Sequence, residues 1–414
     1  MKKLRLLPLL LCLSLAAGCT ASSRIQPITV PEGSPSPVEE TSSLLSEGAG
    51  GYRAFGLELL RTCREEGKNT LVSPLSVTLA LGMTANGASG DTLSEFEALL
   101  GQDRDTLNSL CAAFLSSYAA LGGSSQATLV NSLWADPDLT LKDDFILRCA
   151  DTYQAQLYHA DLQDSKTASA VNAWVSEATH GLIPSVIDQF DSDAALALIN
   201  AVYLKNQFAQ PFPEPHSQWT MPFTAEDGTS SQVPGMNNGT RQEEYIPSDG
   251  GPGVLLPYDD GQLGLLLILP NEGTSLTDCL ASWDASTISA LLEARTKTQV
   301  KLTMPKFQVD WSASLKEVLS DLGLSEAFTP SADFSAMGTT QAGPLYIGDV
   351  IHKTALQVNE KGTEAAAVTA VDMDTKSALP PDSLVILTLN RPFIYAIVDL
   401  NQNIPLFLGT IEKF

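Results

Sequence analysis

Basic residues are scarce in this chain. Its 414 residues include 24 Lys+Arg against 48 Asp+Glu, which gives a formal net charge of −24. A surface with this average charge repels polyanions such as DNA, RNA or sulfated glycans, and no basic cluster beyond the first few residues offsets the repulsion. We therefore expect neither a nucleic-acid partner nor a glycosaminoglycan partner.

Motifs for catalysis are also scarce. The chain has only 4 histidines and lacks HExxH, GxSxG, GxGxxG and a phosphate-binding P-loop. Acidic pairs such as Glu243 and Glu244 are frequent in so acidic a chain, so they do not indicate a glycosidase dyad. The sequence indicates no enzyme, no metal site and no cofactor.

Cysteines are few and widely spaced. No CxxC pair occurs among the 6, and their spacing fits no metal site. Two of them lie in the N-terminal segment discussed next; the others are Cys63, Cys111, Cys149 and Cys279. We interpret these four as small core residues, with one disulfide as the alternative in an exported protein.

The N-terminus has the pattern of an export signal. Three basic residues among the first five precede an apolar run over 6–15, which is shorter than the roughly 20 residues of a membrane span. This pattern predicts a signal peptide over 1–18. The small residues before Cys19 resemble a bacterial lipobox, although Leu15 lies one position further from the cysteine than in the strict motif. The resemblance implies a surface lipoprotein that is lipidated at Cys19 and held at the membrane by that lipid alone. Ordinary secretion is the alternative.

The rest of the chain divides into a linker and one domain. Residues 19–46 are rich in Ser, Pro, Thr and Glu, which predicts a flexible tether with a span of about 30 Å. Residues 47–414 show no repeat and no second linker. Helical periodicity occurs at 52–66, 74–85, 92–100, 106–121, 143–158 and 165–179, and β-rich runs occur at 194–204, 253–257, 263–269, 300–304, 384–389, 393–399 and 406–411. Helices followed by strands predict a single α+β domain.

The segment 360–390 has an unusual pattern. From Thr363 onward, small or apolar residues alternate with a face that carries every acid. This predicts a strand buried on one side. However, Gly362 precedes the pattern, Pro380 and Pro381 follow it, and its alanines disfavour a strand. A small-residue helix or a plain loop fits equally well. The sharper hypothesis is a segment that can be an exposed loop or an inserted strand.

Short motifs along the domain are recognisable as a set. They are NTLVSPLSV at 69–77, ALGM at 80–83, GASGDT at 87–92, NSLW at 131–134, NAWV at 172–175, ALINAVYLK at 197–205, HK at 352–353, NRPF at 390–393 and PLFLG at 405–409. In this order, over nearly all of residues 50–414, the chain resembles the serpins, a family of serine protease inhibitors. The resemblance implies three β-sheets, eight or nine helices and an exposed reactive-centre loop.

The resemblance also implies a mechanism and the residues for it. A target serine protease attacks the loop and forms a covalent acyl-enzyme, and the loop then inserts into the main sheet as a new strand. The implied hinge residues are Glu360, Gly362, Thr363, Glu364, Ala365, Ala366 and Ala367. The inward residues of this hinge are small and uncharged, which favours an active inhibitor over a non-inhibitory surface serpin that acts as a binding protein.

Family spacing from Glu360 places the cleaved bond between Lys376 and Ser377. A basic residue before this bond suits a trypsin-like protease. The register leaves Met373 or Leu379 as the alternative, and these residues suit elastase-like or chymotrypsin-like proteases.

Beneath the insertion site, the resemblance implies a hydrogen-bonded latch, the shutter, formed by Ser73, Ser76, Asn200 and His352. Above it, at the breach, Phe208 replaces the family's tryptophan and lacks the indole donor. We expect a monomer. The competing class, a hydrolytic surface lipoprotein, lacks a nucleophile and base in this sequence.

Overall fold

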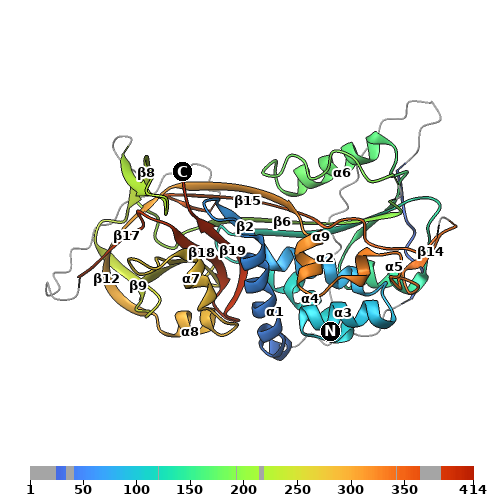
Figure 1. The fold of residues 1–414 in the computed structure, drawn as a ribbon, viewed down its shortest axis with the longest axis horizontal. Helices are drawn as coiled ribbons and strands as arrows, with labels where there is room; N and C mark the ends of the chain where they lie inside the picture. Colours follow the sequence, from blue (N-terminus) through green and yellow to red (C-terminus); the bar gives the residue numbers. More distant parts are fainter. Residues whose placement is uncertain are drawn as a thin grey trace, which may run out of the picture.

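Most helices lie in the first half of the chain and most strands in the second (Figure 1). The computed structural model describes residues 25–33, 42–119, 121–192, 194–213, 219–341, 343–363 and 384–414. Within these ranges the α-helices are α1 (Ser42–Cys63), α2 (Pro74–Ala85), α3 (Gly90–Leu100), α4 (Arg104–Tyr118), α5 (Asp143–Asp151), α6 (Ser165–Ala178), α7 (Leu276–Ala281), α8 (Thr287–Glu293) and α9 (Lys316–Asp321).

One of the sheets has seven strands, and we call it sheet A. Its order is β1 (Gln26–Pro27), β5 (Gln156–His159), β3 (Gln126–Ala135), β6 (Leu196–Gln207), β16 (Gly362–Thr363), β15 (Ile351–Asn359) and β13 (Phe307–Ser314). In Figure 1, α6 covers one face of sheet A, and α1 to α4 lie on the other side.

A ten-stranded sheet, sheet B, forms one end of the molecule. Its order is β2 (Thr70–Val72), β19 (Ile404–Ile411), β18 (Phe393–Asp399), β11 (Leu263–Ile268), β10 (Gly253–Pro257), β9 (Arg241–Ile246), β12 (Thr296–Pro305), β8 (Ser230–Asn237) and β7 (Thr220–Thr224), with β17 (Leu384–Thr388) parallel to β12. β4 (Thr140–Leu141) and β14 (Gly338–Thr339) form the third sheet. The predicted α+β fold with three sheets and nine helices is thus confirmed over the described ranges.

Helix α2 joins the two large sheets. Every residue of α2 except Ala80 is buried, because this helix is apolar all around its axis and not on one stripe alone. It packs against β6 of sheet A and β19 of sheet B. Ser73 starts the helix as its N-cap and Pro74 occupies its first turn, where a missing N–H costs nothing. The N-terminus of α2 is therefore fixed directly beneath sheet A.

Two pieces of the predicted linker 19–46 have regular structure. β1 pairs antiparallel with β5 at the edge of sheet A, where the Ile28 N–H donates to the Leu157 carbonyl at 2.8 Å. Ile25 and Ile28 pack against the core, and this apolar burial outweighs the linker-like composition around them. In addition, α1 begins at Ser42 and not at residue 52 as the periodicity predicts.

The four cysteines of the domain are free and buried: Cys63, Cys111, Cys149 and Cys279. This confirms their interpretation as core residues, and the alternative of a disulfide is wrong. Burial raises the pKa of the Cys63 and Cys111 thiols to about 12, so both stay protonated and unreactive. Among the described residues, no helix combines the length and apolarity that a membrane span requires.

Thiol chemistry tests this burial. We expect the segment 20–414 to bind almost no thiol reagent under native conditions and to bind four equivalents after unfolding in guanidinium chloride. The measurement is titration with a chromogenic disulfide reagent. Rapid native labelling, or fewer than four thiols in the unfolded chain, would contradict the structure.

Candidate functional site: the slot and hinge of sheet A

Sheet A contains an opening between β6 and β15. In the described part of the chain these two strands do not pair with each other; each pairs with the two-residue strand β16 at one end. Farther along the opening from β16 lies a cavity of about 510 Å³, which is lined by residues 194–201 on the β6 side and 343–353 on the β15 side. Because β16 occupies the end of this opening as a strand, we call the remainder a strand-wide slot.

The hinge turns directly into this slot. After β15 the chain reverses over Glu360 and Lys361 and returns as β16, where Thr363 pairs with Asn206 on one side and Val358 on the other. Gly362 has φ +147°, and a β-carbon there would lie 2.1 Å from the Asn206 carbonyl oxygen. Only glycine fits this close approach.

Backbone and charge contacts hold the turn. The Phe208 N–H donates to the Lys361 carbonyl at 2.8 Å, and the Phe212 N–H donates to the Glu360 carbonyl at 2.7 Å. The ammonium group of Lys306 pairs with the Glu360 carboxylate. Arg241 supports the segment after Phe208 from outside, because its guanidinium donates to the Pro211 carbonyl at 2.8 Å and lies over the Phe212 ring. The hinge is thus tied to two neighbouring segments.

Phe208, the predicted breach residue, lies beside the hinge. Its ring stacks on Tyr258, with centroids 5.4 Å apart and planes inclined by 1°. The Tyr258 hydroxyl forms a hydrogen bond with the Thr363 hydroxyl. Tyr258 follows strand β10, so its contact with the hinge connects sheet B to sheet A.

Three of the four predicted shutter residues meet beneath the slot. The Ser73 N–H donates to Nε2 of His352 at 3.0 Å, the Ser73 hydroxyl donates to the Leu406 carbonyl at 3.0 Å, and the Ser76 N–H donates to Ser73 Oγ at 3.2 Å. Asn200 differs, because its amide donates to Asn131 Oδ1 on the adjacent strand β3 at 2.9 Å. His352 and Asn200 therefore lie on opposite walls of the slot.

His352 is held in its neutral form. Its side chain is 4% exposed, and burial lowers the pKa of the imidazole to about 4. Since Nε2 accepts the Ser73 N–H, protonation of this nitrogen would break the contact between β15 and the start of α2.

Other predicted site residues lie outside the described residues: Cys19, Glu364, Ala365, Ala366, Ala367, Met373, Lys376, Ser377 and Leu379. Lys306 and Tyr258 contact the hinge although no sequence pattern predicted them. Lys306 lies 54 positions from Glu360 and Tyr258 lies 105 positions from Thr363. Lys306 is one of three lysines within residues 297–306, so its charge does not distinguish it, and an interior tyrosine carries no signal either.

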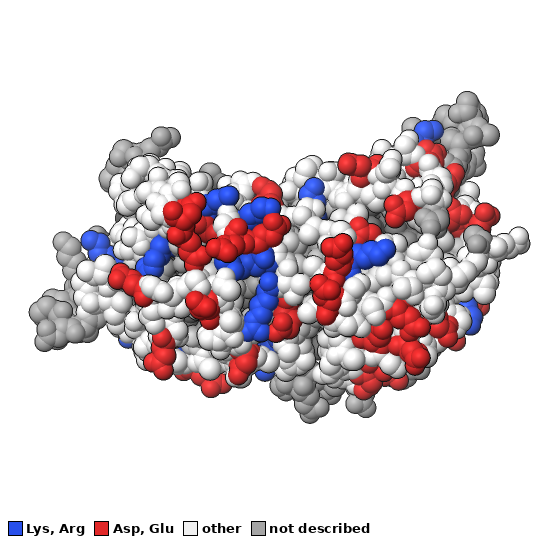
Figure 2. All heavy atoms as spheres, in the orientation of Figure 1, with Lys and Arg blue, Asp and Glu red and all other residues white. Residues whose placement is uncertain are grey.

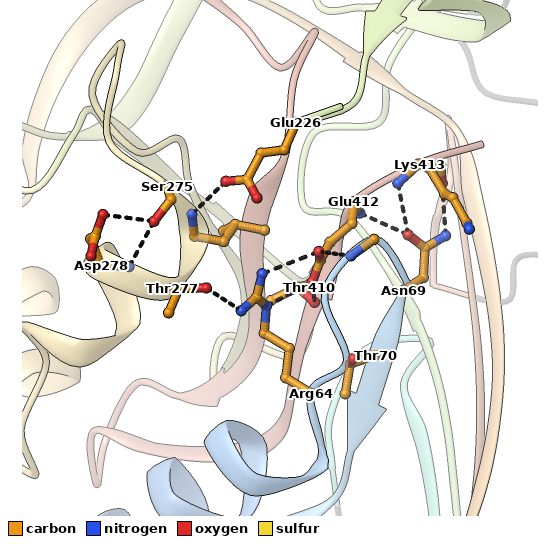
Figure 3. Close-up of polar contacts among 12 residues, drawn as sticks. Arg64, Asn69, Thr70, Glu226, Ser275, Thr277, Asp278, Thr410, Glu412 and Lys413 are labelled. Atoms are coloured by element: carbon orange, nitrogen blue, oxygen red, sulfur yellow. Dashed lines mark hydrogen bonds and ion pairs between the residues drawn. The ribbon is translucent and has the colours of Figure 1, made fainter. Parts of the chain in front are cut away.

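The C-terminus is fastened to the segment between α1 and β2 (Figure 3). The Glu412 carboxylate accepts hydrogen bonds from Arg64 Nε and from the Gly67 N–H, both at 2.7 Å. Asn69 Oδ1 accepts from the backbone N–H groups of Glu412 and Lys413 at 2.7 and 3.1 Å. The last strand, β19, is therefore secured to α1 and β2 independently of the hinge.

The structure is that of an α+β protein whose sheet A is open between β6 and β15. The chain belongs to the serpin family: the family model described as Serpin (serine protease inhibitor) matches residues 51–413. Iripin-8 of Ixodes ricinus is 32% identical over 372 residues, which cover 86% of this chain and 91% of that protein. A serpin-like protein of Thermococcus kodakarensis is 30% identical and covers 86% of this chain and 83% of its own.

Solved serpin structures agree with the fold. The thermophilic serpin tengpin in its native state superposes with a TM-score of 0.83 at 32% identity, covering 92% of this chain and 97% of tengpin. Tengpin in its latent state gives a TM-score of 0.77 at 33% identity, covering 88% and 97%.

The buried imidazole makes a pH-dependent prediction. A histidine with an ordinary pKa of 6.5 in the unfolded chain and about 4 in the fold binds a proton first when unfolded. The neutral His352 therefore contributes its full share to the free energy of unfolding above pH 6.5. This share is lost as the pH falls toward 4, by up to about 3 kcal/mol in total. As the pH is lowered from 7 to 4, the urea concentration at the unfolding midpoint should fall less steeply for His352→Gln than for the wild type.

His180→Asn is the matched control, because His180 is exposed. We expect it to keep the wild-type slope. If the urea midpoints of His352→Gln and of the wild type depend on pH with the same slope, His352 is not the group that titrates.

Proposed function

We propose that this protein is an inhibitory serpin that traps a trypsin-like serine protease as its acyl-enzyme after cleavage at Lys376–Ser377. One observation carries the proposal: Gly362 and Thr363 already lie between β6 and β15, and within the described residues these two strands do not pair with each other along the rest of the opening. In the proposed mechanism, the chain that follows Thr363 enters the slot after cleavage.

The length and energy of insertion support this role. An extended strand over 363–376 is roughly 46 Å long at about 3.3 Å per residue, which is comparable with the diameter of a domain. A new central strand gains on the order of a dozen backbone hydrogen bonds at about 1 kcal/mol each. A total of about 10 kcal/mol equals the stability of a typical domain. A protease carried across that distance would lose the oxyanion-hole and triad geometry that deacylation needs.

The position of Thr363 supports inhibition over mere cleavage. Thr363 is buried between two strands, and if the following residues insert as a strand, alternation would place Ala365 and Ala367 on the same side as Thr363. Small side chains at these positions let the backbone pair on both sides without a clash. A charged or bulky residue there would have to be buried without a partner.

The surface supports a protein partner in preference to a polyanion. Figure 2 shows acidic side chains gathered in several clusters, with fewer basic ones between them, in keeping with a formal net charge of −24. Basic surfaces on a protease would be attracted, and nucleic acids or sulfated glycans would be repelled.

We also propose export through the signal 1–18 and anchoring through a lipid on Cys19. Because β1 is paired at the edge of sheet A, only the seven residue steps from Cys19 to Gln26 separate the lipid from the domain. Fully extended, they reach about 25 Å. The β1 edge of sheet A would therefore stay close to the membrane, and the linker beyond β1 would add no reach.

Incubation with proteases tests the inhibition. We expect the segment 20–414 to form an SDS-resistant adduct with trypsin and to release a C-terminal fragment that begins at Ser377, as read by denaturing electrophoresis and intact mass. An adduct with a different fragment would move the bond to Met373 or Leu379. Cleavage without an adduct by trypsin, chymotrypsin and elastase alike would overturn inhibition and favour a binding protein.

The same assay tests the mechanism. Thr363→Arg should convert the inhibitor into a substrate, because a large charged side chain would have to be buried between β6 and β15. Thr296→Arg, at an exposed threonine of β12, is the matched control and should inhibit normally. Inhibition by Thr363→Arg at the wild-type level would exclude strand insertion.

A further inference from the structure

The hydrogen bond between Tyr258 and Thr363 links the hinge to a residue with no predicted role. Both side chains are 1% exposed, and both oxygen atoms belong to hydroxyl groups. We propose that Tyr258 is a positioning residue that holds the hinge at two inserted residues, so that insertion starts from a defined register. This inference rests on the proposed function, because it concerns how the same loop begins to insert.

The Tyr258 and Thr363 hydroxyls are each other's hydrogen-bond partners. No further side-chain partner is recorded for either oxygen among the described residues. A buried hydroxyl that loses its partner costs more than the net value of one hydrogen bond, since it was removed from water and gains nothing in exchange. Burial raises the pKa of Tyr258, so its hydroxyl keeps the proton and can donate.

The Tyr258 ring cannot follow the hinge if the hinge leaves. The ring lies flat against Phe208, and the Tyr258 N–H donates to the Leu263 carbonyl at 3.0 Å. The next residue, Asp259, donates its N–H to the Gln207 carbonyl at 2.9 Å. The hydroxyl is therefore fixed in space by sheet B and by the end of β6.

The hydrogen bond between Tyr258 and Thr363 stabilises only one state of the hinge. It exists only while Thr363 lies between β6 and β15, so its free energy favours the inserted hinge over the withdrawn one. A hydrogen bond of ordinary strength changes the ratio of inserted to withdrawn hinge by about fivefold. Because the acyl-enzyme is hydrolysed if insertion is slow, a withdrawn hinge would yield more cleaved serpin for each trapped protease.

Phe208 and Tyr258 have complementary roles beside the hinge. The Phe208 ring lies beside the hinge and has no hydrogen-bonding group. The hydroxyl that bonds the hinge there belongs to Tyr258, which stacks on Phe208. Phe208 orients the ring, and Tyr258 supplies the polar contact.

Four variants and one control test the role. Tyr258→Phe and Thr363→Val each remove one hydroxyl, Thr363→Ser keeps it, and the double variant Tyr258→Phe/Thr363→Val removes both. The control is Tyr118→Phe, which deletes a buried tyrosine hydroxyl that contacts Asp399 at 3.1 Å in another part of the core. Urea unfolding establishes that each variant is folded. If Tyr258→Phe does not fold, the two Thr363 variants test the same bond from the other side.

The first readout is hydrogen exchange of the Gly362 and Thr363 amides by mass spectrometry. We expect exchange about fivefold faster in Tyr258→Phe and in Thr363→Val, wild-type exchange in Thr363→Ser and Tyr118→Phe, and a double variant less affected than two independent losses would give. Unchanged exchange in Tyr258→Phe, or strictly additive effects in the double variant, would overturn the proposal.

The second readout is the number of serpin molecules consumed per trypsin adduct, which should rise severalfold in Tyr258→Phe and not in Tyr118→Phe. An unchanged number in Tyr258→Phe would also contradict the role. If the wild type forms no adduct with any protease, the proposed inhibition fails, and the exchange data still decide whether Tyr258 holds the hinge.

Discussion

The backbone edges of β6 and β15 are the constraint on which the rest of the structure depends. Interior strands must pair their N–H and C=O groups on both sides, because a buried unpaired group costs free energy. In sheet A these two edges face each other across the slot, and β16 pairs with both over only two residues. In the proposed mechanism, the chain that follows Thr363 supplies one further strand that pairs with both edges.

Contacts around the slot hold its walls and the hinge in place. At one end, Lys306 and Tyr258 hold the hinge through Glu360 and Thr363. Beneath it, neutral His352 ties β15 to the start of α2. Since the Ser73 hydroxyl also reaches the Leu406 carbonyl, the same contact extends to sheet B. Movement of β15 would thus be opposed by contacts in both sheets, while the C-terminus stays fastened by Glu412.

Sequence patterns predicted the elements whose stabilising contacts lie close together in the sequence. The helix at 74–85 has the predicted bounds, because its cap and its apolar residues are adjacent in sequence. The helix expected over 143–158 instead ends at Asp151, and Gln156–His159 is a strand because it pairs with β3, a partner that periodicity does not reveal. At the site, the family motifs located Ser73, His352 and Phe208. The partners Lys306 and Tyr258 depend on folding contacts between distant residues, so no spacing predicted them.

The most direct test of strand insertion compares the intact protein with the protein cleaved once in its reactive loop. Urea unfolding followed by circular dichroism measures both forms under one condition. If the loop fills the slot, the cleaved protein gains a central strand and should unfold at a much higher urea concentration, in keeping with roughly 10 kcal/mol of added stability. An equal or lower midpoint after cleavage would show that the slot does not accept the loop, and would contradict the account.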